Sequence, residues 1–488
     1  MKTLPLPPYH LFHCRGQPFA FDIRTGLVLR LDDAAFALLA AEAPDDGPAP
    51  ASGGTGAREA RHELDLLRSQ GILTGPIEIP DHRDDVQYVD RLLPGSINSL
   101  TLSVAQACNL RCRYCYIAAN GALANGLMSE ETARQAVDFL FAHSSKDRIG
   151  ITFFGGEPLL NQAVIRFVVA YSQKVAAAAG RKVGYSVTTN ATLLSGELLD
   201  FMLAHRFGIM VSMDGPRDVH DRARPFADGA GSFDTAVRNV RGLLARGRSV
   251  NARCTLSNLC LNQLRIVQAL EEIGFRKVTI TPSWGRAREH WPFDIGPQEN
   301  DYLRRQDDFF MDRLLDQLAQ GRKVRFDPWA KAVRAIHTRA HPRLPCGVGR
   351  GTLTAGVDGS LYPCHRYVGE ERYRIGDVRQ GLDRSRLAAY FKTYFQSRDR
   401  CDTCWAVKLC QRVCPWHVTQ ADGQGHSPSD WLCASLRTWY EQGMWLYDVI
   451  RRRYPWYLAE VAGGGRVRPK RPGRRHSQVD NKLGREAR

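Results

Sequence analysis

The sequence predicts an α/β fold in which a parallel sheet curves into a partial barrel of six strand–helix units. A small N-terminal α+β unit precedes the barrel, and a cysteine-rich region follows it. Two observations support this prediction. Short apolar segments alternate with amphipathic segments through the middle third of the 488 residues. Ten of the 13 cysteines fall into two groups, one after the first apolar segment and one in the C-terminal third.

The N-terminal unit is predicted to hold two strands followed by two helices. The expected elements are strands at residues 11–21 and 27–31, a helix opened by Asp32 and Asp33, and a helix at residues 58–69. The second helix has Leu64, Leu66 and Leu67 as its apolar face. Residues 44–56, rich in Pro, Gly and Ala, form a flexible connection, and residues 75–96 form a linker. The pattern predicts a winged-helix domain with its linker over residues 1–90.

The partial barrel is expected over residues 91–325. Its strands are predicted at residues 99–105, 150–154, 183–189, 208–213, 250–256 and 277–281. Between the first two strands, Ser129 is a good N-cap for a helix whose first turn holds Glu130 and Glu131. Asn161 and Gly180 bracket the next helix. The carboxyl ends of parallel strands meet at one edge, so a site is expected there.

Three cysteines follow the first strand at the spacing Cys108-x₃-Cys112-x₂-Cys115. Three thiolates hold only three irons of a cubane, which leaves the fourth iron open to a substrate or cofactor. A structural zinc site needs four ligands, and a disulfide framework needs an oxidising compartment. The sequence predicts neither a signal peptide nor a membrane-spanning segment. We therefore expect a cytoplasmic protein whose thiols stay reduced.

The charge of the chain does not by itself favour nucleic-acid binding. The formal net charge is +16, but residues 463–488 hold nine Lys and Arg against Asp480 and Glu486, which is +7 of that total. We expect this glycine- and proline-containing tail, assigned to residues 456–488, to be disordered. A solvated tail explains it better than RNA or DNA binding. The remaining charge is suited to an acidic peptide partner.

Polar motifs also follow the second and third strands. Gly155, Gly156 and Glu157 offer close backbone approach, exposed carbonyls and a carboxylate, which suit an ammonium group. Ser186 and Asn190 belong to a segment whose hydroxyl and amide groups suit a ribose or a carboxylate. Capping of the next helix explains this second segment equally well.

Together with Tyr116 and the segment Ser212-Met-Asp-Gly-Pro216, these motifs resemble the radical S-adenosylmethionine (SAM) superfamily. The resemblance implies a 4Fe-4S cluster whose open iron is chelated by the methionine moiety of SAM. Reductive cleavage then releases a 5′-deoxyadenosyl radical that abstracts a substrate hydrogen. The roles it implies are iron ligation by Cys108, Cys112 and Cys115, adenine contact by Tyr116, methionine contact by Gly155, Gly156 and Glu157, and ribose contact by Ser186.

The C-terminal cysteines resemble the SPASM extension of peptide-modifying radical SAM enzymes, expected here over residues 326–455. The resemblance implies two auxiliary 4Fe-4S clusters, one held by Cys401, Cys404, Cys410 and Cys433, the other by Cys346, Cys364 and Cys414. Some relatives have a further cysteine where this chain has Thr352. Either the second cluster keeps an open iron for a substrate thiolate, or another side chain fills it. The candidates are Cys254, Cys260, His365 and His417, although burial is the more expected role for the two cysteines.

The order of the three regions resembles maturases that crosslink genetically encoded peptides, especially those acting on the γ subunit of quinohemoprotein amine dehydrogenase. The resemblance implies a precursor-recognition element at residues 9–73 that captures a peptide by β-augmentation. It also implies thioether bonds between Cys sulfur and Asp or Glu carbons of a small polypeptide, and a low-potential donor of flavodoxin or ferredoxin type. The alternatives are another crosslinking peptide maturase, a sulfatase-type maturase that oxidises Cys or Ser, and an iron–sulfur regulator or electron carrier.

Overall fold

The computed structural model describes most of the chain outside its tail. The described residues are 7–42, 55–75, 77, 96–119, 121, 124–284, 292–339, 344, 346–397, 401, 403–410, 414–419, 425 and 427–462. Most of the expected connection at 44–56, most of the linker at 75–96 and most of the tail expected at 456–488 lie outside them. The start of that tail was wrongly expected to be disordered: Pro455–Val461 is a helix, because Tyr457 and Leu458 are buried in the core. Within the described residues, no helix has the length and apolar character that crossing a membrane requires.

The N-terminal unit begins with a three-stranded antiparallel sheet of order β1-β2-β3. Its strands are β1 (Tyr9–Cys14), β2 (Gln17–Asp22) and β3 (Val28–Arg30). The prediction of one strand over residues 11–21 was wrong, because the chain reverses at Arg15 and Gly16. Both residues have positive φ, 53° and 72°, as a type I′ hairpin turn requires. An Arg-Gly pair carries a weaker turn signal than Asn-Gly, and apolar residues flank it on both sides.

Two helices, α1 (Asp33–Glu42) and α2 (Thr55–Ser69), pack with this sheet around a small separate core. Leu39 and Leu64 are almost fully buried in that core. Leu66, expected on the apolar face, is instead 55% exposed, because two residues along a helix turn the side chain by about 200°. The winged-helix assignment stays a prediction.

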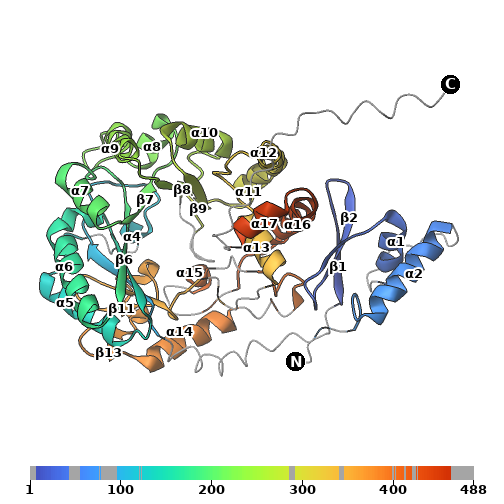
Figure 1. Cartoon of the computed structure of the whole chain (residues 1–488), viewed down its shortest axis with the longest axis horizontal. Helices are drawn as coiled ribbons and strands as arrows, with labels where there is room; N and C mark the ends of the chain where they lie inside the picture. The colour runs from blue at the N-terminus through green and yellow to red at the C-terminus, as the bar shows by residue number, and fades with distance from the viewer. Residues whose placement is uncertain are drawn as a thin grey trace.

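The six predicted barrel strands are present and parallel, with an order that follows the sequence. They are β4 (Ser99–Ala105), β5 (Arg148–Gly155), β6 (Lys182–Thr189), β7 (Gly208–Ser212), β8 (Asn251–Leu256) and β9 (Lys277–Pro282). The predicted partial barrel is therefore confirmed. Its outer wall is formed by helices, as Figure 1 shows. These include α5 (Glu130–Ala142), α6 (Gln162–Ala178), α7 (Gly196–Ala204), α8 (Arg217–Ala223), α9 (Phe233–Ala245) and α10 (Gln263–Ile273).

Local sequence explains where the first of these helices begins. The Ser129 hydroxyl accepts a hydrogen bond from the Thr132 amide at 3.1 Å, so Ser129 is the predicted N-cap of α5. Asn161 precedes α6 but does not cap it with its side chain. Its amide instead donates to the Val104 and Met128 carbonyls, both at 2.9 Å. Asn161 thus ties the start of α6 to the end of β4, where the cysteine loop begins.

The C-terminal region is built onto the first barrel strand. Its β10 (Thr352–Ala355) pairs in parallel with β4, and β11 (Leu361–Tyr362) pairs antiparallel with β10, which extends the sheet to eight strands. The remaining helices are α11 (Pro297–Arg304), α12 (Asp307–Ala319), α13 (Ala330–Thr338), α14 (Arg384–Gln396), α15 (Pro415–Val418), α16 (Asp430–Arg453) and α17 (Pro455–Val461). This pairing carries residues 364–366 to the site end of the barrel.

The N-terminal sheet docks on the C-terminal region, beside α16 (Figure 1). The His10 ring stacks on Trp405 with centroids 3.9 Å apart, and His10 Nε2 lies 2.8 Å from Glu441 Oε1. Arg15 pairs with Asp312 on α12. Trp405 directly follows Cys404, so this contact joins the N-terminal unit to the cysteine-rich segment.

Candidate active site at the open end of the barrel

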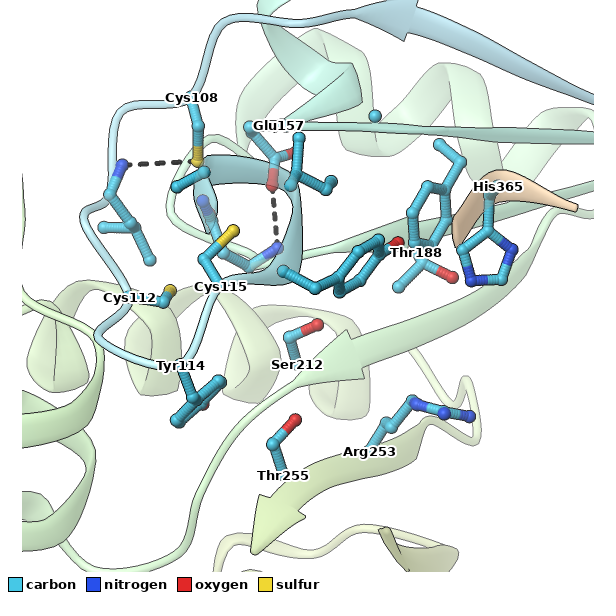
Figure 2. A pocket seen from close by; sticks show the side chains of 18 of the residues that line it. Cys108, Cys112, Tyr114, Cys115, Glu157, Thr188, Ser212, Arg253, Thr255 and His365 are labelled. Atoms are coloured by element: carbon cyan, nitrogen blue, oxygen red, sulfur yellow. Dashed lines mark hydrogen bonds between the residues drawn. The ribbon is translucent and has the colours of Figure 1, made fainter. Parts of the chain in front are cut away.

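A cavity of about 480 Å³ lies at the carboxyl ends of the barrel strands. The three-cysteine loop after β4, the ends of β5 to β9, and the segment around His365 form its walls. Figure 2 shows the three cysteines together on one side of this space and His365 on the other. The cavity therefore lies between the barrel and the C-terminal region.

The three-cysteine loop is fastened to the end of α8. Its Arg111 amide donates to the Pro225 carbonyl at 2.8 Å, and its Arg113 amide donates to the Ala223 carbonyl at 3.0 Å. Burial raises the pKa of the Cys108 thiol to about 11 and that of Cys112 to about 12. Bound metal would hold these thiols as thiolates. Among the described residues, no three metal-binding side chains converge on one ion, and a cubane does not need this because each thiolate binds a different iron.

A buried ion pair supports the loop from below. The Arg224 Nε donates to the Asp214 carboxylate at 2.8 Å, and Arg224 Nη1 lies 3.8 Å from the Cys112 sulfur. Tyr114 also donates to Asp214, and the Thr255 amide does so at 3.0 Å. Burial alone would raise the pKa of Asp214, but the Arg224 guanidinium outweighs it and the pKa is lowered. Asp214 is thus an ionised carboxylate whose oxygens accept hydrogen bonds from Arg224, Tyr114 and Thr255.

Replacing Asp214 should strongly destabilise the protein. Asp214→Ala leaves the guanidinium of Arg224 buried without its partner, and we expect the free energy of unfolding to fall by about 3–5 kcal/mol. Denaturant unfolding of the reconstituted protein measures this. Asp218→Ala is the matched control, because Asp218 pairs with Arg265 at the surface and should cost about 0–1 kcal/mol. Equal effects of the two substitutions would contradict the interpretation.

The two glycines after β5 pack against the lead-in to the cysteine loop. A Cβ on Gly155 would lie 2.1 Å from the Ala105 carbonyl oxygen, and one on Gly156 would lie 2.3 Å from that of Ala107. The Gly156 amide donates to Ala105 and the Glu157 amide to Ala107, at 2.8 and 2.9 Å. We expected these glycines to admit a ligand. The structure shows that they also accommodate the chain's own backbone. Both glycines line the cavity, so their contact with a ligand stays a prediction.

Gly156→Ala should therefore displace the cysteine loop. The added methyl group meets backbone oxygen, which cannot move aside as a flexible side chain does, so we expect about 1–3 kcal/mol less stability and less iron bound after reconstitution. Unfolding curves and iron analysis measure these effects. Gly242→Ala on α9 is the control, because nothing lies within 4 Å of its added Cβ. An iron content equal to that of the control would contradict the prediction.

Glu157 is 1% exposed, and three donors occupy its carboxylate. These are the Thr189 hydroxyl at 2.7 Å and the amides of Asn190 and Leu159 at 2.8 and 3.1 Å. Burial raises the pKa of Glu157 to about 7 despite these bonds. The carboxylate thus holds the end of β6 in place, and its contact with a methionine amine stays a proposal.

Of the polar residues at the end of β6, Thr188 and Asn190 line the cavity, whereas Ser186 does not. Asn190 lines the cavity, but its side chain already bonds Asn109 and Thr192, at 2.9 and 2.7 Å. Ser186 is not among the lining residues, and its hydroxyl lies 2.8 Å from that of Thr152, which does line the cavity. Thr188, two residues further along the same face, also lines it. Ribose contact through Ser186 would therefore run by way of Thr152.

Tyr116 is placed where the two halves of the site meet. It lies at the start of α4 (Tyr116–Ala119), and its ring contacts His365 and Trp416 with centroids 6.2 Å away. Its hydroxyl is buried and has no hydrogen-bond partner among the residues that the structure describes. A buried orphan hydroxyl costs free energy unless a ligand satisfies it. The site thus offers an unfilled polar position next to an aromatic face.

The C-terminal cysteines gather in the two expected sets. The pKa of Cys433 is raised to about 11, mainly by burial and further by the charges of Cys401, Cys410 and Cys404. Burial raises the pKa of Cys364 to about 12, and Cys414 and Cys346 add to this effect. Each set is therefore close in space, although its members are far apart in the sequence. Cluster ligation by them stays a proposal.

The position of a missing fourth ligand can be narrowed. Thr352 is at the start of β10, where its hydroxyl lies 3.0 Å from that of Ser99. Cys254 is fully buried beside Asp214, as a core residue would be. His365 Nδ1 lies 3.6 Å from the Cys364 sulfur. His365 thus contacts a cysteine of the set Cys346, Cys364 and Cys414. Cys260 and His417 stay candidates for the fourth ligand.

Sequence reasoning missed Arg253 and Arg366 as site residues. Arg253 is on β8 and Arg366 follows Cys364 by two positions, and both line the cavity. The available signal was weak. An arginine within a strand and an arginine near a cysteine are each common in proteins and do not by themselves indicate a functional site. Only the pairing of β10 with β4 brings the two together.

Residues 102–261 match the model of the Radical SAM superfamily. The fold is the radical SAM α/β fold. A cysteine-type anaerobic sulfatase-maturating enzyme of Clostridium novyi is 24% identical over 370 residues, which cover 72% of this chain and 96% of that protein. The structure of native anSMEcpe with bound AdoMet and the Cp18Cys peptide aligns with a TM-score of 0.59 at 20% identity, covering 72% of this chain and 99% of that one.

A second solved structure aligns over more of the chain. Streptococcus suis SuiB bound to its precursor peptide SuiA covers 88% of this chain and 99% of its own, with a TM-score of 0.50 and 11% identity. At these identities the structural likeness shows the radical SAM fold alone.

The radical SAM fold implies a 4Fe-4S cluster and SAM, and the residues present fit both. Three thiols from one loop match a cubane with an open iron. The loop is held by the Gly155 and Gly156 packing and by Arg224. The orphan Tyr116 hydroxyl and the neighbouring cavity provide room for a nucleoside.

Proposed function

We propose that this protein is a radical SAM enzyme that forms thioether bonds within a small polypeptide, between Cys sulfur and an Asp or Glu side-chain carbon. The supporting observation is one cavity with three cysteines at one end and, at the other end, a histidine that contacts a cysteine of a second set. Cys108, Cys112 and Cys115 line it directly. At the other end it is lined by His365, which contacts Cys364 of the second set.

At the end of the cavity lined by Cys108, Cys112 and Cys115, the cluster and SAM would supply the chemistry when bound. Reduced cluster and SAM supply a 5′-deoxyadenosyl radical that removes a hydrogen atom from carbon. The protein's own residues hold the three-cysteine loop rigid through Arg224, Gly155 and Gly156. They also enclose the reacting carbon between the barrel and the C-terminal region, where bulk water is restricted.

The cysteines at the other end are suited to the sulfur. Cys346, Cys364 and Cys414 offer one thiolate fewer than a cubane has irons, so a substrate cysteine has a place to bind and lose its proton. Overall, the substrate loses one hydrogen atom from carbon, one proton from sulfur and one electron as the carbon–sulfur bond forms. The hydrogen atom would end in 5′-deoxyadenosine, and an auxiliary cluster held by these cysteines would accept the electron. The set Cys401, Cys404, Cys410 and Cys433 would hold a further cluster for electron transfer.

The N-terminal unit would bring the peptide to this cavity. Its antiparallel sheet has an edge strand on each side, as β-augmentation by a peptide requires. Its β1 docks on the cysteine-rich segment through His10 and Trp405. The alignment with SuiB in complex with its precursor peptide SuiA, which covers 88% of the chain, supports a peptide substrate. The γ subunit of quinohemoprotein amine dehydrogenase is the substrate we infer, with a flavodoxin- or ferredoxin-type protein as the reductant.

A second candidate is oxidation of a Cys or Ser residue in a sulfatase. The alignment with the cysteine-type sulfatase-maturating enzyme of Clostridium novyi over 96% of its length favours it. The two functions differ in their product. Thioether formation retains the substrate sulfur, whereas oxidation of a cysteine to an aldehyde removes it.

Reductive turnover and mass spectrometry test the proposal. The reconstituted protein with SAM and dithionite should release 5′-deoxyadenosine; no release would refute the radical SAM enzyme. When a short Cys- and acid-rich polypeptide from a neighbouring reading frame is co-expressed with the protein, the mass of that polypeptide should fall by two hydrogens per thioether bond. Fragmentation must then join a Cys to an Asp or Glu. Loss of sulfur would instead support the second candidate.

A further inference from the structure

Arg253 enters the cavity from β8 and meets no acidic side chain there. Figure 2 shows its guanidinium on the side of the cavity away from the three cysteines. Within the part of the chain that the structure describes, no carboxylate lies within ion-pair distance of it, although the ion pairs of other arginines are recorded throughout the fold. Its strand position is fixed, because the Arg253 carbonyl accepts from the Met213 amide at 3.1 Å.

A second arginine approaches from the opposite wall. Arg366 stacks on Trp416 and Tyr116, at 4.8 and 5.4 Å from their ring centroids. The Arg253 side chain is exposed to the cavity. Desolvation by the cavity walls lowers its pKa, and the charge of Arg366 lowers it further. Two like charges in a restricted cavity repel each other, and an anion between them would remove that cost.

The cavity's own acids do not supply this anion. Glu157 is fully occupied by three donors, and its pKa is raised to about 7. Asp214 is paired with Arg224 beneath the cysteine loop. The remaining sources are the clusters, the carboxylate of SAM and the substrate.

The position of Arg253 separates these sources. Thiolate-ligated clusters carry negative charge, but Arg366 is the arginine whose charge lowers the pKa of both Cys364 and Cys346. Of that set, only Cys414 is named among the charges that act on Arg253. The SAM carboxylate belongs beside the open iron, at the three-cysteine end. Arg253 instead lies on the His365 side of the cavity, away from the three cysteines (Figure 2). Its charge lowers the pKa of His365 after the larger effects of burial and Arg366. That is the substrate's side of the cavity.

We propose that Arg253 is a specificity-determining residue that binds the side-chain carboxylate of the acidic peptide residue presented to the cofactor. This inference rests on the proposed function and names the residue that selects its target. A guanidinium can bind a carboxylate through two parallel hydrogen bonds, which fix its plane. The methylene next to the carboxylate is then oriented as well, so one arrangement provides both selection and positioning.

The test compares peptide binding by the reconstituted protein and its Arg253→Gln variant, in the presence of SAM and without reductant. The probes are a short rhodamine-labelled peptide with one glutamate and one cysteine, and the same peptide with glutamine in place of glutamate. For the unsubstituted protein we expect about tenfold tighter binding of the glutamate peptide, as a charged hydrogen bond provides. For Arg253→Gln we expect this preference to fall to about twofold or less. Fluorescence anisotropy measures both affinities.

Two further variants keep the test decisive. Arg253→Lys retains the positive charge but lacks the forked guanidinium, so it should keep part of the preference for the glutamate peptide. Arg265→Gln removes a surface arginine outside the cavity and should leave the preference unchanged. A preference retained in Arg253→Gln would overturn the inference. Weakened binding of SAM to Arg253→Gln in calorimetry would also overturn it, because the carboxylate of the cofactor would then be the ligand of Arg253.

Failure of this inference is distinguishable from failure of the proposed function. If the unsubstituted protein makes 5′-deoxyadenosine and crosslinks a peptide, but binds the glutamate and glutamine peptides equally, only the role of Arg253 is lost. If no crosslink forms with any peptide, the proposed function is lost, whatever the binding data show.

Discussion

Cys108→Ala should abolish formation of 5′-deoxyadenosine and, with it, every crosslink. Cys108 is one of only three thiols in the loop that lines the cavity, so its removal leaves two thiolates for a cubane that needs three. We expect the signal of this cluster to disappear from the electron paramagnetic resonance spectrum of the reduced protein. Chromatography of the turnover mixture should show product at the level of the blank without enzyme.

Cys14→Ala is the matched control for that experiment. Cys14 is a buried thiol at the end of β1, in the N-terminal sheet, and it belongs to none of the three cysteine sets. Its replacement should leave turnover of SAM intact. If Cys108→Ala still released 5′-deoxyadenosine at a rate comparable to that of Cys14→Ala, the loop would not be the ligand set that we propose.

Cys401→Ala should separate cofactor cleavage from crosslinking. Cys401 belongs to the set whose charges act on Cys433, and it lines no part of the cavity that holds Cys108, Cys112 and Cys115. We expect less iron per chain, partial retention of 5′-deoxyadenosine formation, and loss of the two-hydrogen decrease in peptide mass. Iron analysis, chromatography and mass spectrometry measure these three quantities on one sample.

The control here is Cys260→Ala, a partly buried cysteine after β8 that lies outside the four-cysteine set. It should retain crosslinking. Unimpaired crosslinking by Cys401→Ala would remove this cysteine set from the mechanism. Loss of both activities to the same extent would mean instead that the substitution disrupts the fold, which the unfolding curve would show.

The barrel could be predicted closely because its signals are local. Each of the six strands is a short apolar run, and Ser129 caps its helix through an amide only three residues away. The prediction failed at Arg15 and Gly16, where a hairpin turn interrupts one apolar run. It also failed at Leu66, which local spacing placed on the buried face. The Arg-Gly pair carries a weak turn signal, and Leu66 is turned by about 200° from Leu64 along the helix.

The candidate site was only partly predictable, because much of it depends on contacts between distant segments. The packing of Gly155 and Gly156 was not predicted, because the carbonyls that they accommodate lie some 50 residues earlier in the chain, at Ala105 and Ala107. The hydrogen bonds that Glu157 accepts from Thr189 and Asn190 were not predicted either. All three residues line the cavity, and their contact with SAM stays a prediction. A side chain's available hydrogen bonds are known only when its neighbours are known.

The sequence by itself determined the cysteine spacings, the strand–helix alternation and hence the chemistry expected at the carboxyl edge of the sheet, because these depend on residues close together in the chain. Only the tertiary structure decided which side chains share the cavity. The pairing of β10 with β4 places His365 and Arg366 opposite Arg253. Those residues are more than 100 positions apart, so their juxtaposition arises from packing alone.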